Sequence, residues 1–359
     1  MSARRDIEKD VLAWMREPDW RDDAARFGAL ALRLFAFQFE HCPPLRRFCE
    51  GRGRTPESVD DWRDIPLVPT GAFKELALRC FPAEQTLRTF TTSGTSAARP
   101  GALHLDTLEL YEASLLPSFR RHLLPDVGRI RLLVLGPPPD EAPESSLSHM
   151  FGCVVDVLGA PGSGFYLSRG GLETERLVDA LRQAAEPVAL CGAAFAFVHL
   201  LDALEQGGVR LALPAGSRVM ETGGFKGRSR ESSRDALDAQ IEERLGIGPA
   251  RVVNQYGMTE LGSQFYDSVL REPDARRRKL APPWTRVRIL DPETGSDARP
   301  GEIGAIAVYD LANTGSVLAV QTADLGRQRD DGFELLGREP GAEQRGCSIA
   351  IDELIADTP

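Results

Sequence analysis

Asn254-Gln255-Tyr256-Gly257-Met258-Thr259-Glu260 is the most informative stretch of the chain. It follows the apolar run Ala250-Arg251-Val252-Val253, which predicts a buried strand, so the motif is expected on the turn after that strand. A ring can cover a nucleobase, a hydroxyl can reach a phosphate, and a carboxylate can hold Mg²⁺ through oxygen. A structural interpretation is also open. Tyr256 would then fill a core, and Glu260 would begin a helix, where the dipole favours a carboxylate.

A second segment, Thr91-Thr92-Ser93-Gly94-Thr95-Ser96, follows a strand predicted over residues 86–91. Hydroxyls and bare backbone N–H groups are the donors that phosphate oxygens need. Strings of serine, threonine and glycine also form ordinary surface turns. The two segments together, in this order, indicate an enzyme that activates a carboxylic acid with ATP.

Two later segments favour the same chemistry. Thr322-Ala323-Asp324-Leu325-Gly326 is expected to place a carboxylate after a strand at 315–322, where it could accept from both ribose hydroxyls. Gly337-Arg338 then offers a cation near a phosphate or a ribose. Each segment is common by itself, but four of them in the required order are not.

Composition excludes several other classes of protein. The chain has 359 residues, which predicts two or more lobes, and its 42% hydrophobic and 27% charged residues are typical of globular proteins. A net charge of −10 argues against nucleic-acid partners and against anionic membrane surfaces. The chain opens with a charged segment and contains no long apolar run, so we expect neither a secretory signal nor membrane insertion. Six cysteines without a paired spacing predict reduced thiols and a cytoplasmic protein.

The pattern of elements predicts an α/β fold with several parts. Residues 6–50 have helical periodicity interrupted at Pro43-Pro44, residues 130–254 alternate between strands and helices, and short strands with turns follow Trp284. The expected domains are an N-terminal helical region (1–64), an α/β nucleotide- and acyl-binding core (65–283), a β-rich subdomain (284–337) and a short C-terminal segment (338–359).

These motifs together resemble the adenylate-forming superfamily of acyl-CoA synthetases, luciferases and adenylation domains. Within it, the chain is similar to the acyl-protein synthetases of bacterial bioluminescence (LuxE type) and to their relatives near phenylacetate–CoA ligase. The residues that carry this likeness are Ile65-Pro66 with Phe73-Lys74, Glu221-Thr222-Gly223-Gly224-Phe225-Lys226-Gly227, and Leu336-Gly337-Arg338 running into Gln344-Arg345-Gly346-Cys347. The resemblance covers residues from about Ile65 to Leu354.

The resemblance implies a large domain of layered α/β sheets with a small β-rich subdomain, lacking most of the C-terminal mobile domain. It also implies site residues, with ATP and Mg²⁺ as cofactors. Thr259 would touch the α-phosphate and Glu260 would bind Mg²⁺, while Asp324 would hold the ribose and Arg338 would contact ribose or phosphate. The remaining nucleotide-binding residues would be Thr92, Ser93, Gly94, Thr95 and Ser96 around the phosphates, and Gly223, Gly224, Tyr256 and Gly257 around the adenine.

The chain departs from the wider superfamily in its lysines. The usual phosphate-loop lysine is absent from Ser96-Ala97-Ala98-Arg99-Pro100-Gly101. Arg99 could replace its positive charge, and this alternative stays open. The sequence ends 21 residues after Arg338, and no lysine follows Lys279. Most of the superfamily carries a lysine in a further mobile domain, whereas the LuxE type is similarly short.

Cys347 is the expected acyl acceptor. In the LuxE type, a cysteine near the C-terminus accepts the acyl group and passes it to a reductase partner. Arg345 could lower the pKa of the Cys347 thiol, and a thiolate is a strong nucleophile. Alternatively, Ser348–Ile351 forms a short strand that buries Cys347 as a small apolar side chain.

The sequence indicates the class of the acid substrate but not its identity. The runs Gly192–Val198 and Ser146–Val157 would wall an apolar slot, which fits a fatty or aromatic acid better than an amino acid. Cys191 is expected on the floor of this slot and not as a nucleophile. Two interpretations are open for His104 and His149. They could act near the acid, or they could have structural roles, which is more common for lone histidines.

Three hypotheses follow. The first is an AMP-forming acid–thiol ligase that passes the acyl group to its own Cys347 or to a partner protein. The second is a ligase that ends at coenzyme A or at the pantetheine of a carrier protein. The third is an inert nucleotide-binding module, suggested by the missing lysine-bearing domain and the altered phosphate loop.

Overall fold

The computed structural model describes residues 2–92, 100–168, 171–223 and 234–338. The chain divides into two compact units, each of which is described by itself. Unit 1 contains residues 1–115, 258–264 and 280–359, and unit 2 contains residues 116–257 and 265–279. The chain therefore passes from unit 2 to unit 1 between Gly257 and Met258, within the motif at residues 254–260.

Unit 1 combines N-terminal helices with antiparallel strands. Its helices are α1 (Ser2–Met15), α2 (Ala24–His41), α3 (Pro43–Glu50), η1 (Trp62–Asp64), α4 (Ala72–Glu75) and η2 (Ala83–Gln85). Its strands are β1 (Val68–Pro69), β2 (Arg88–Thr91), β3 (Ala102–Leu105), β13 (Thr285–Leu290), β14 (Gly304–Asp310), β15 (Ala319–Arg329) and β16 (Gly332–Arg338). Helix α5 (Glu109–Leu123) and strand β12 (Lys279–Leu280) cross the boundary between the units.

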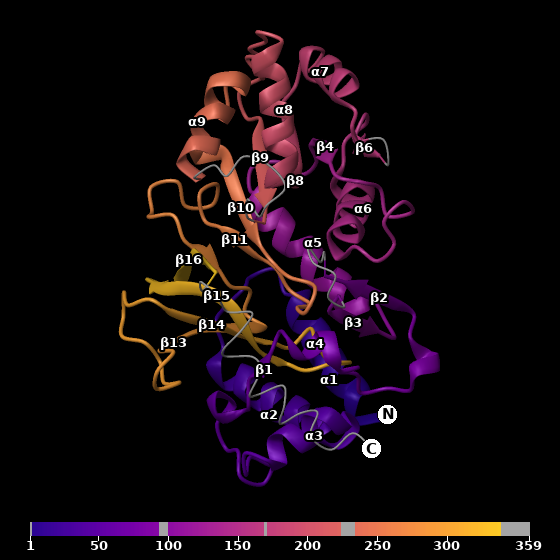
Figure 1. The fold of residues 1–359 in the computed structure, drawn as a ribbon, viewed down its shortest axis with the longest axis vertical. Coiled ribbons are helices and arrows are strands. Elements are labelled where there is room, and N and C mark those ends of the chain that lie inside the picture. The colour runs from indigo at the N-terminus through magenta and orange to yellow at the C-terminus, as the bar shows by residue number, and fades with distance from the viewer. Residues whose placement is uncertain (1, 93–99, 169–170, 224–233, 339–359) are drawn as a thin grey trace. The chain divides into compact units, whose positions relative to one another are not determined.

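The N-terminal helices form because apolar residues repeat at helical spacing behind a capped start. The Asp23 side chain accepts from the Arg26 N–H and caps α2, which buries Phe27, Leu30 and Leu34 along one face. The predicted interruption at Pro43 separates α2 from α3, in which Pro43 is the first helical residue, where a missing N–H costs nothing. Helices α2 and α3 lie next to each other in Figure 1.

Strands β13, β14, β15 and β16 pair antiparallel in chain order, and β1 adds to β15 in parallel. The prediction that Asp324 follows a strand at 315–322 is wrong. The strand begins at Ala319 and continues to Arg329, because β16 pairs with its second half and places Arg338 opposite Asp324. Gly337 and Arg338 are the last two residues of β16.

Unit 2 is a mostly parallel sheet with helical connections. Its strand order is β11-β10-β9-β8-β4-β5, with only β11 antiparallel to its neighbour. Its strands are β4 (Arg131–Leu135), β5 (Gly164–Phe165), β8 (Val188–Ala193), β9 (Arg218–Thr222), β10 (Val252–Tyr256) and β11 (Phe265–Asp267), with the small pair β6 (Leu167–Ser168) and β7 (Gly171–Leu172). Its helices are α6 (Ser146–Leu158), α7 (Thr174–Arg182), α8 (Ala194–Gln206), α9 (Arg234–Leu245) and η3 (Pro249–Arg251).

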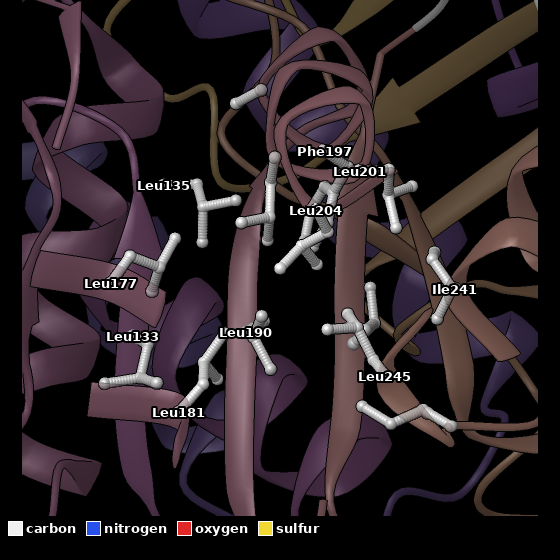
Figure 2. Packing of buried hydrophobic residues seen from close by; sticks show 14 of the residues in the cluster. Leu133, Leu135, Leu177, Leu181, Leu190, Phe197, Leu201, Leu204, Ile241 and Leu245 are labelled. Atoms are coloured by element: carbon white, nitrogen blue, oxygen red, sulfur yellow. The ribbon is translucent and has the colours of Figure 1, made fainter. Parts of the chain in front are cut away.

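The core of unit 2 lies between the sheet and helices α7, α8 and α9. Figure 2 shows Leu190 of β8 near Leu181 of α7, and Phe197, Leu201 and Leu204 of α8 and Ile241 of α9 belong to the same cluster. These side chains are buried, as expected for parallel strands covered by helices. The predicted α/β fold is confirmed. Helix α6 was not predicted, because its N-cap Ser145 lies in the Pro/Ser/acid segment 139–148, which favours a loop.

Candidate active site

Glu260 lies in a turn of unit 1 between strands β10 and β11, and no helix follows it. The alternative of a carboxylate at the start of a helix is therefore wrong. The Glu260 residue is only 7% exposed, and this burial raises the pKa of its carboxyl group, while the nearby positive charges of Arg338 and Lys74 oppose the rise. A buried carboxylate can bind a divalent metal through oxygen, and cationic side chains near it can neutralise phosphates.

Lys74 lies near the candidate site, although no role is predicted for it from the sequence. It belongs to the one-turn helix α4 and acts electrostatically on Glu260. A Cβ added to Gly101 would lie 3.3 Å from Thr92 Cγ2 and 3.6 Å from Lys74 Cγ, so Lys74 lies beside the base of the predicted phosphate loop. An ammonium group there can supply the charge of the absent phosphate-loop lysine.

Thr92 closes the base of that loop. The Gly101 N–H donates to Thr92 Oγ1 at 2.9 Å, and the Thr92 N–H donates to the Gly101 carbonyl at 2.9 Å. The same hairpin contacts the Glu260 turn, because Thr259 Oγ1 donates to the Thr91 carbonyl at 3.3 Å. Thr92, Thr259 and Glu260 are thus brought together within unit 1.

Asp324 and Arg338 form an ion pair on the neighbouring strands β15 and β16. Arg338 Nε lies 3.3 Å from Asp324 Oδ1, and the Asp324 N–H donates to Thr322 Oγ1 at 3.1 Å. Both charges act on Glu260. The four segments found in the sequence therefore place Thr92, Thr259, Glu260, Asp324 and Arg338 in the same unit.

Gly223 and Tyr256 lie in unit 2 at the carboxyl ends of two neighbouring parallel strands. Gly223 directly follows β9, and Tyr256 is the last residue of β10. Thr222 is in register with Gln255, and Thr222 Oγ1 donates to the Gln255 carbonyl at 3.1 Å. Gly223 has a φ of +83°, which favours glycine. Ligands of parallel α/β sheets bind at this edge. Tyr256 is nevertheless 6% exposed and its ring packs 6.0 Å from that of Phe265, so its core interpretation also holds.

A buried charged network fixes the strands behind this edge. Lys279 Nζ donates to the Asn254 carbonyl at 2.7 Å and to Asp267 Oδ1 at 2.8 Å. Asn254 Nδ2 donates to Glu221 Oε1 at 2.6 Å, and Arg234 lies 2.6 Å from Asp267. Burial lowers the pKa of Lys279 to about 8 and raises the pKa of Glu221.

Several of the predicted site residues are not among those that the structure describes. Ser93, Gly94, Thr95, Ser96, Gly224 and Cys347 lie outside the described residues. Gly257 is the last residue of this segment of unit 2, before the chain enters unit 1.

The remaining candidates fit structural roles. Cys191 lies buried in β8, where burial raises the pKa of its thiol, so it is not poised to react. His104 Nδ1 lies 3.1 Å from Thr89 Oγ1 across the β2–β3 pair, and burial lowers its pKa. His149 Nε2 lies 3.6 Å from Cys153 Sγ, one turn along α6.

A family model described as "Acyl-protein synthetase, LuxE" matches residues 9–356. The chain belongs to the LuxE acyl-protein synthetase family. Two relatives, both named long-chain-fatty-acid–luciferin-component ligase, agree with this assignment. The one from Aliivibrio fischeri is 23% identical and the alignment covers 97% of this chain and 94% of that protein. The one from Vibrio harveyi is 22% identical, over 96% of this chain and 93% of that protein. The predicted family and the class of acyl ligase are confirmed.

Solved structures share the fold of this LuxE-family chain. An open conformation of 2-hydroxyisobutyryl-CoA ligase, in complex with 2-HIB-AMP and CoA, has a TM-score of 0.65 at 17% identity, over 88% of this chain and 70% of the ligase. ATP-bound MatB from Rhodopseudomonas palustris has a TM-score of 0.50 at 19% identity, over 72% of this chain but only 49% of MatB. None of the helices in the described residues has the length and apolar content needed to span a bilayer.

Proposed function

We propose that this LuxE-family ligase uses ATP and Mg²⁺ to convert a fatty or aromatic acid to an acyl-adenylate, and then transfers the acyl group to a protein thiol. The observation that supports this most strongly is the gathering of Glu260, Thr259, Lys74, Asp324 and Arg338 in unit 1. The names of the two relatives specify a long-chain fatty acid, which supports a fatty acid over an aromatic acid as the substrate.

In adenylation, a carboxylate oxygen attacks the α-phosphorus of ATP and pyrophosphate leaves. Glu260 would hold Mg²⁺, which neutralises phosphate charge when bound. Its single buried carboxylate fits a metal that takes one or two protein carboxylates and completes its shell with phosphates and water. Lys74 would add positive charge at the leaving pyrophosphate, and Thr259 would donate to the α-phosphate.

The nucleoside would be held by the other residues. Asp324 would accept from the ribose hydroxyls, with Arg338 keeping its carboxylate ionised and oriented. Gly223, Gly224, Tyr256 and Gly257 would border the adenine, and Thr92 to Ser96 would donate to the β- and γ-phosphates. A cytoplasmic location is part of the proposal, since the five cysteines of the described residues are free.

ATP–pyrophosphate exchange with a panel of fatty and aromatic acids separates the proposed enzyme from an inert module. We expect exchange that depends on the acid and on Mg²⁺. Tight ATP binding without exchange for any acid would instead identify a nucleotide-binding protein that has lost catalysis.

Replacing Cys347 with serine identifies the acceptor. In the wild type, radiolabel from the acid should survive denaturation as a covalent acyl-enzyme, because the thiolate displaces AMP and forms a thioester. The Cys347→Ser variant should lose this label almost completely and keep its exchange activity. Cys49→Ser, which removes a buried thiol of α3, is the control and should keep the label. Label that moves only to added coenzyme A or to a carrier protein would favour the second hypothesis.

Replacing Lys74 with methionine tests the assignment of the missing phosphate-loop charge. Methionine keeps the apolar stem of the side chain but removes the ammonium group, so we expect exchange to fall by about a hundredfold. The measurement is the rate of exchange at saturating acid over a range of Mg·ATP concentrations. Lys9→Met removes an exposed lysine of α1 and should leave the rate unchanged. Equal rates for Lys74→Met and the wild type would show that another group supplies the charge.

A further inference from the structure

The backbone of Glu260 is held by the loop that follows β14. Asn313 Nδ2 donates to the Glu260 carbonyl at 2.8 Å and lies 3.3 Å from the Val317 carbonyl. Asn313 is 2% exposed, so this amide makes its hydrogen bonds away from water, where an unpaired partner would be costly.

The other end of the Glu260 turn is held by Asp310. Ser263 Oγ donates to Asp310 Oδ1 at 2.8 Å, and the Ala312 N–H donates to the same oxygen at 2.9 Å. Ser263 Oγ in turn accepts from Ser114 Oγ at 2.9 Å and from Trp284 Nε1 at 3.1 Å. The turn is therefore connected to the 310–313 segment at both Glu260 and Ser263.

Between these two points the turn and the loop are in direct contact. A Cβ added to Gly262 would lie 2.8 Å from the Ala312 Cβ and 3.1 Å from Asn313 Oδ1. No side chain fits in this space without moving the loop, so glycine permits the approach that the hydrogen bonds require.

Gln38 of helix α2 fixes the loop itself. Gln38 Nε2 donates to the Asn313 carbonyl at 2.7 Å, and the Leu318 N–H donates to Gln38 Oε1 at 2.9 Å. Gln38 is completely buried among the apolar residues of α2, and both ends of its amide are used. Because the nitrogen and the oxygen of the Gln38 amide are both hydrogen-bonded, Gln38 favours one arrangement of the loop backbone.

We propose that Asn313 and Gln38 are positioning residues for the Glu260 carboxylate, so that the N-terminal helix α2 takes part in catalysis through the backbone of the turn. This inference rests on the proposed role of Glu260 as the Mg²⁺ ligand. Gln38 orients Asn313, Asn313 holds the Glu260 carbonyl, and Asp310 closes the turn. A displacement of about 1 Å in a reacting group can cost about a hundredfold in rate.

The test compares Asn313→Leu and Gln38→Leu with a matched variant, Ser316→Ala. Ser316 Oγ, in the same loop, donates to the Leu78 carbonyl at 2.7 Å, so its side-chain hydrogen bond is to a segment other than the Glu260 turn. All three variants lose a buried hydrogen bond, so their thermal unfolding reports the purely structural cost. Exchange rates over a range of Mg²⁺ concentrations, and Mn²⁺ binding by electron paramagnetic resonance in the presence of ATP, report the position of Glu260.

We expect Asn313→Leu and Gln38→Leu to lower kcat for exchange by about tenfold or more and to weaken Mn²⁺ binding, whereas Ser316→Ala keeps both values near those of the wild type. If all three variants lose stability alike and keep wild-type kcat and Mn²⁺ affinity, the two residues are structural only and the inference is wrong. If the wild type itself shows no exchange, the proposed function fails separately. Mn²⁺ binding then decides the inference, with unchanged affinity in the variants overturning it.

Discussion

Replacing Glu260 with glutamine is expected to reduce ATP–pyrophosphate exchange by about a hundred- to a thousandfold. The amide has nearly the same shape as the carboxylate but carries no charge, so it is a poor ligand for Mg²⁺. The turn should persist, because the hydrogen bonds that hold it use the Glu260 carbonyl and the Ser263 hydroxyl and not the carboxylate. The measurement is exchange at saturating acid and ATP, combined with the thermal unfolding temperature.

The control for this variant is Glu302→Gln, which removes an exposed carboxylate paired with Arg299 in the same unit. It should keep wild-type exchange, because exposed ion pairs contribute little. A Glu260→Gln protein that is folded and exchanges pyrophosphate at the wild-type rate would remove Glu260 from the metal site.

Replacing Lys279 with methionine is expected to have the largest effect on stability. Lys279 is 2% exposed and donates to the Asn254 carbonyl and to Asp267, so its loss leaves buried oxygens without this donor and the Asp267 carboxylate with Arg234 and Arg277 as its remaining cations. Removing one partner of a buried ion pair typically lowers the free energy of unfolding by about 3–5 kcal/mol. Urea denaturation measures this loss.

A double-mutant cycle separates charge from packing at this position. Asp267→Asn in the Lys279→Met background should restore part of the lost free energy, because it removes a buried carboxylate that has lost the Lys279 ammonium group. Arg33→Met, which breaks the exposed pair between Arg33 and Asp10, should cost no more than about 1 kcal/mol. If Lys279→Met unfolds at the same urea concentration as the wild type, the buried network does not stabilise the sheet of unit 2.

Elements whose signals are local in the sequence could be predicted. The strand over Thr285–Leu290 depends on a short run of apolar residues followed by turn residues. A strand before Tyr256 is predicted in the same way, but the expectation that the whole motif lies on the turn after it is wrong, because β10 continues to Tyr256. The motif around Glu260 was found for the same reason, since its ring, hydroxyl and carboxylate lie within five residues of one another in the sequence.

Features that depend on distant partners could not be predicted. Asp324 lies within β15 because β16 pairs with this part of the strand. No residue near Asp324 in the sequence indicates that pairing. Lys74 belongs to a single helical turn, and only the fold brings it beside Gly101 and Glu260. Asn313 resembles an ordinary turn residue, whereas the structure uses its side chain to hold Glu260.

The central claim is that the carboxylate of the acid attacks the α-phosphate of ATP. An acid labelled with ¹⁸O in its carboxylate tests this most directly, because the attacking oxygen becomes the bridge of the acyl-adenylate and leaves with AMP when the acyl group is transferred. We predict AMP that carries one heavy oxygen, detected by mass spectrometry. Heavy oxygen in inorganic phosphate with ADP as the product, or unlabelled AMP alongside acyl transfer, would contradict the claim.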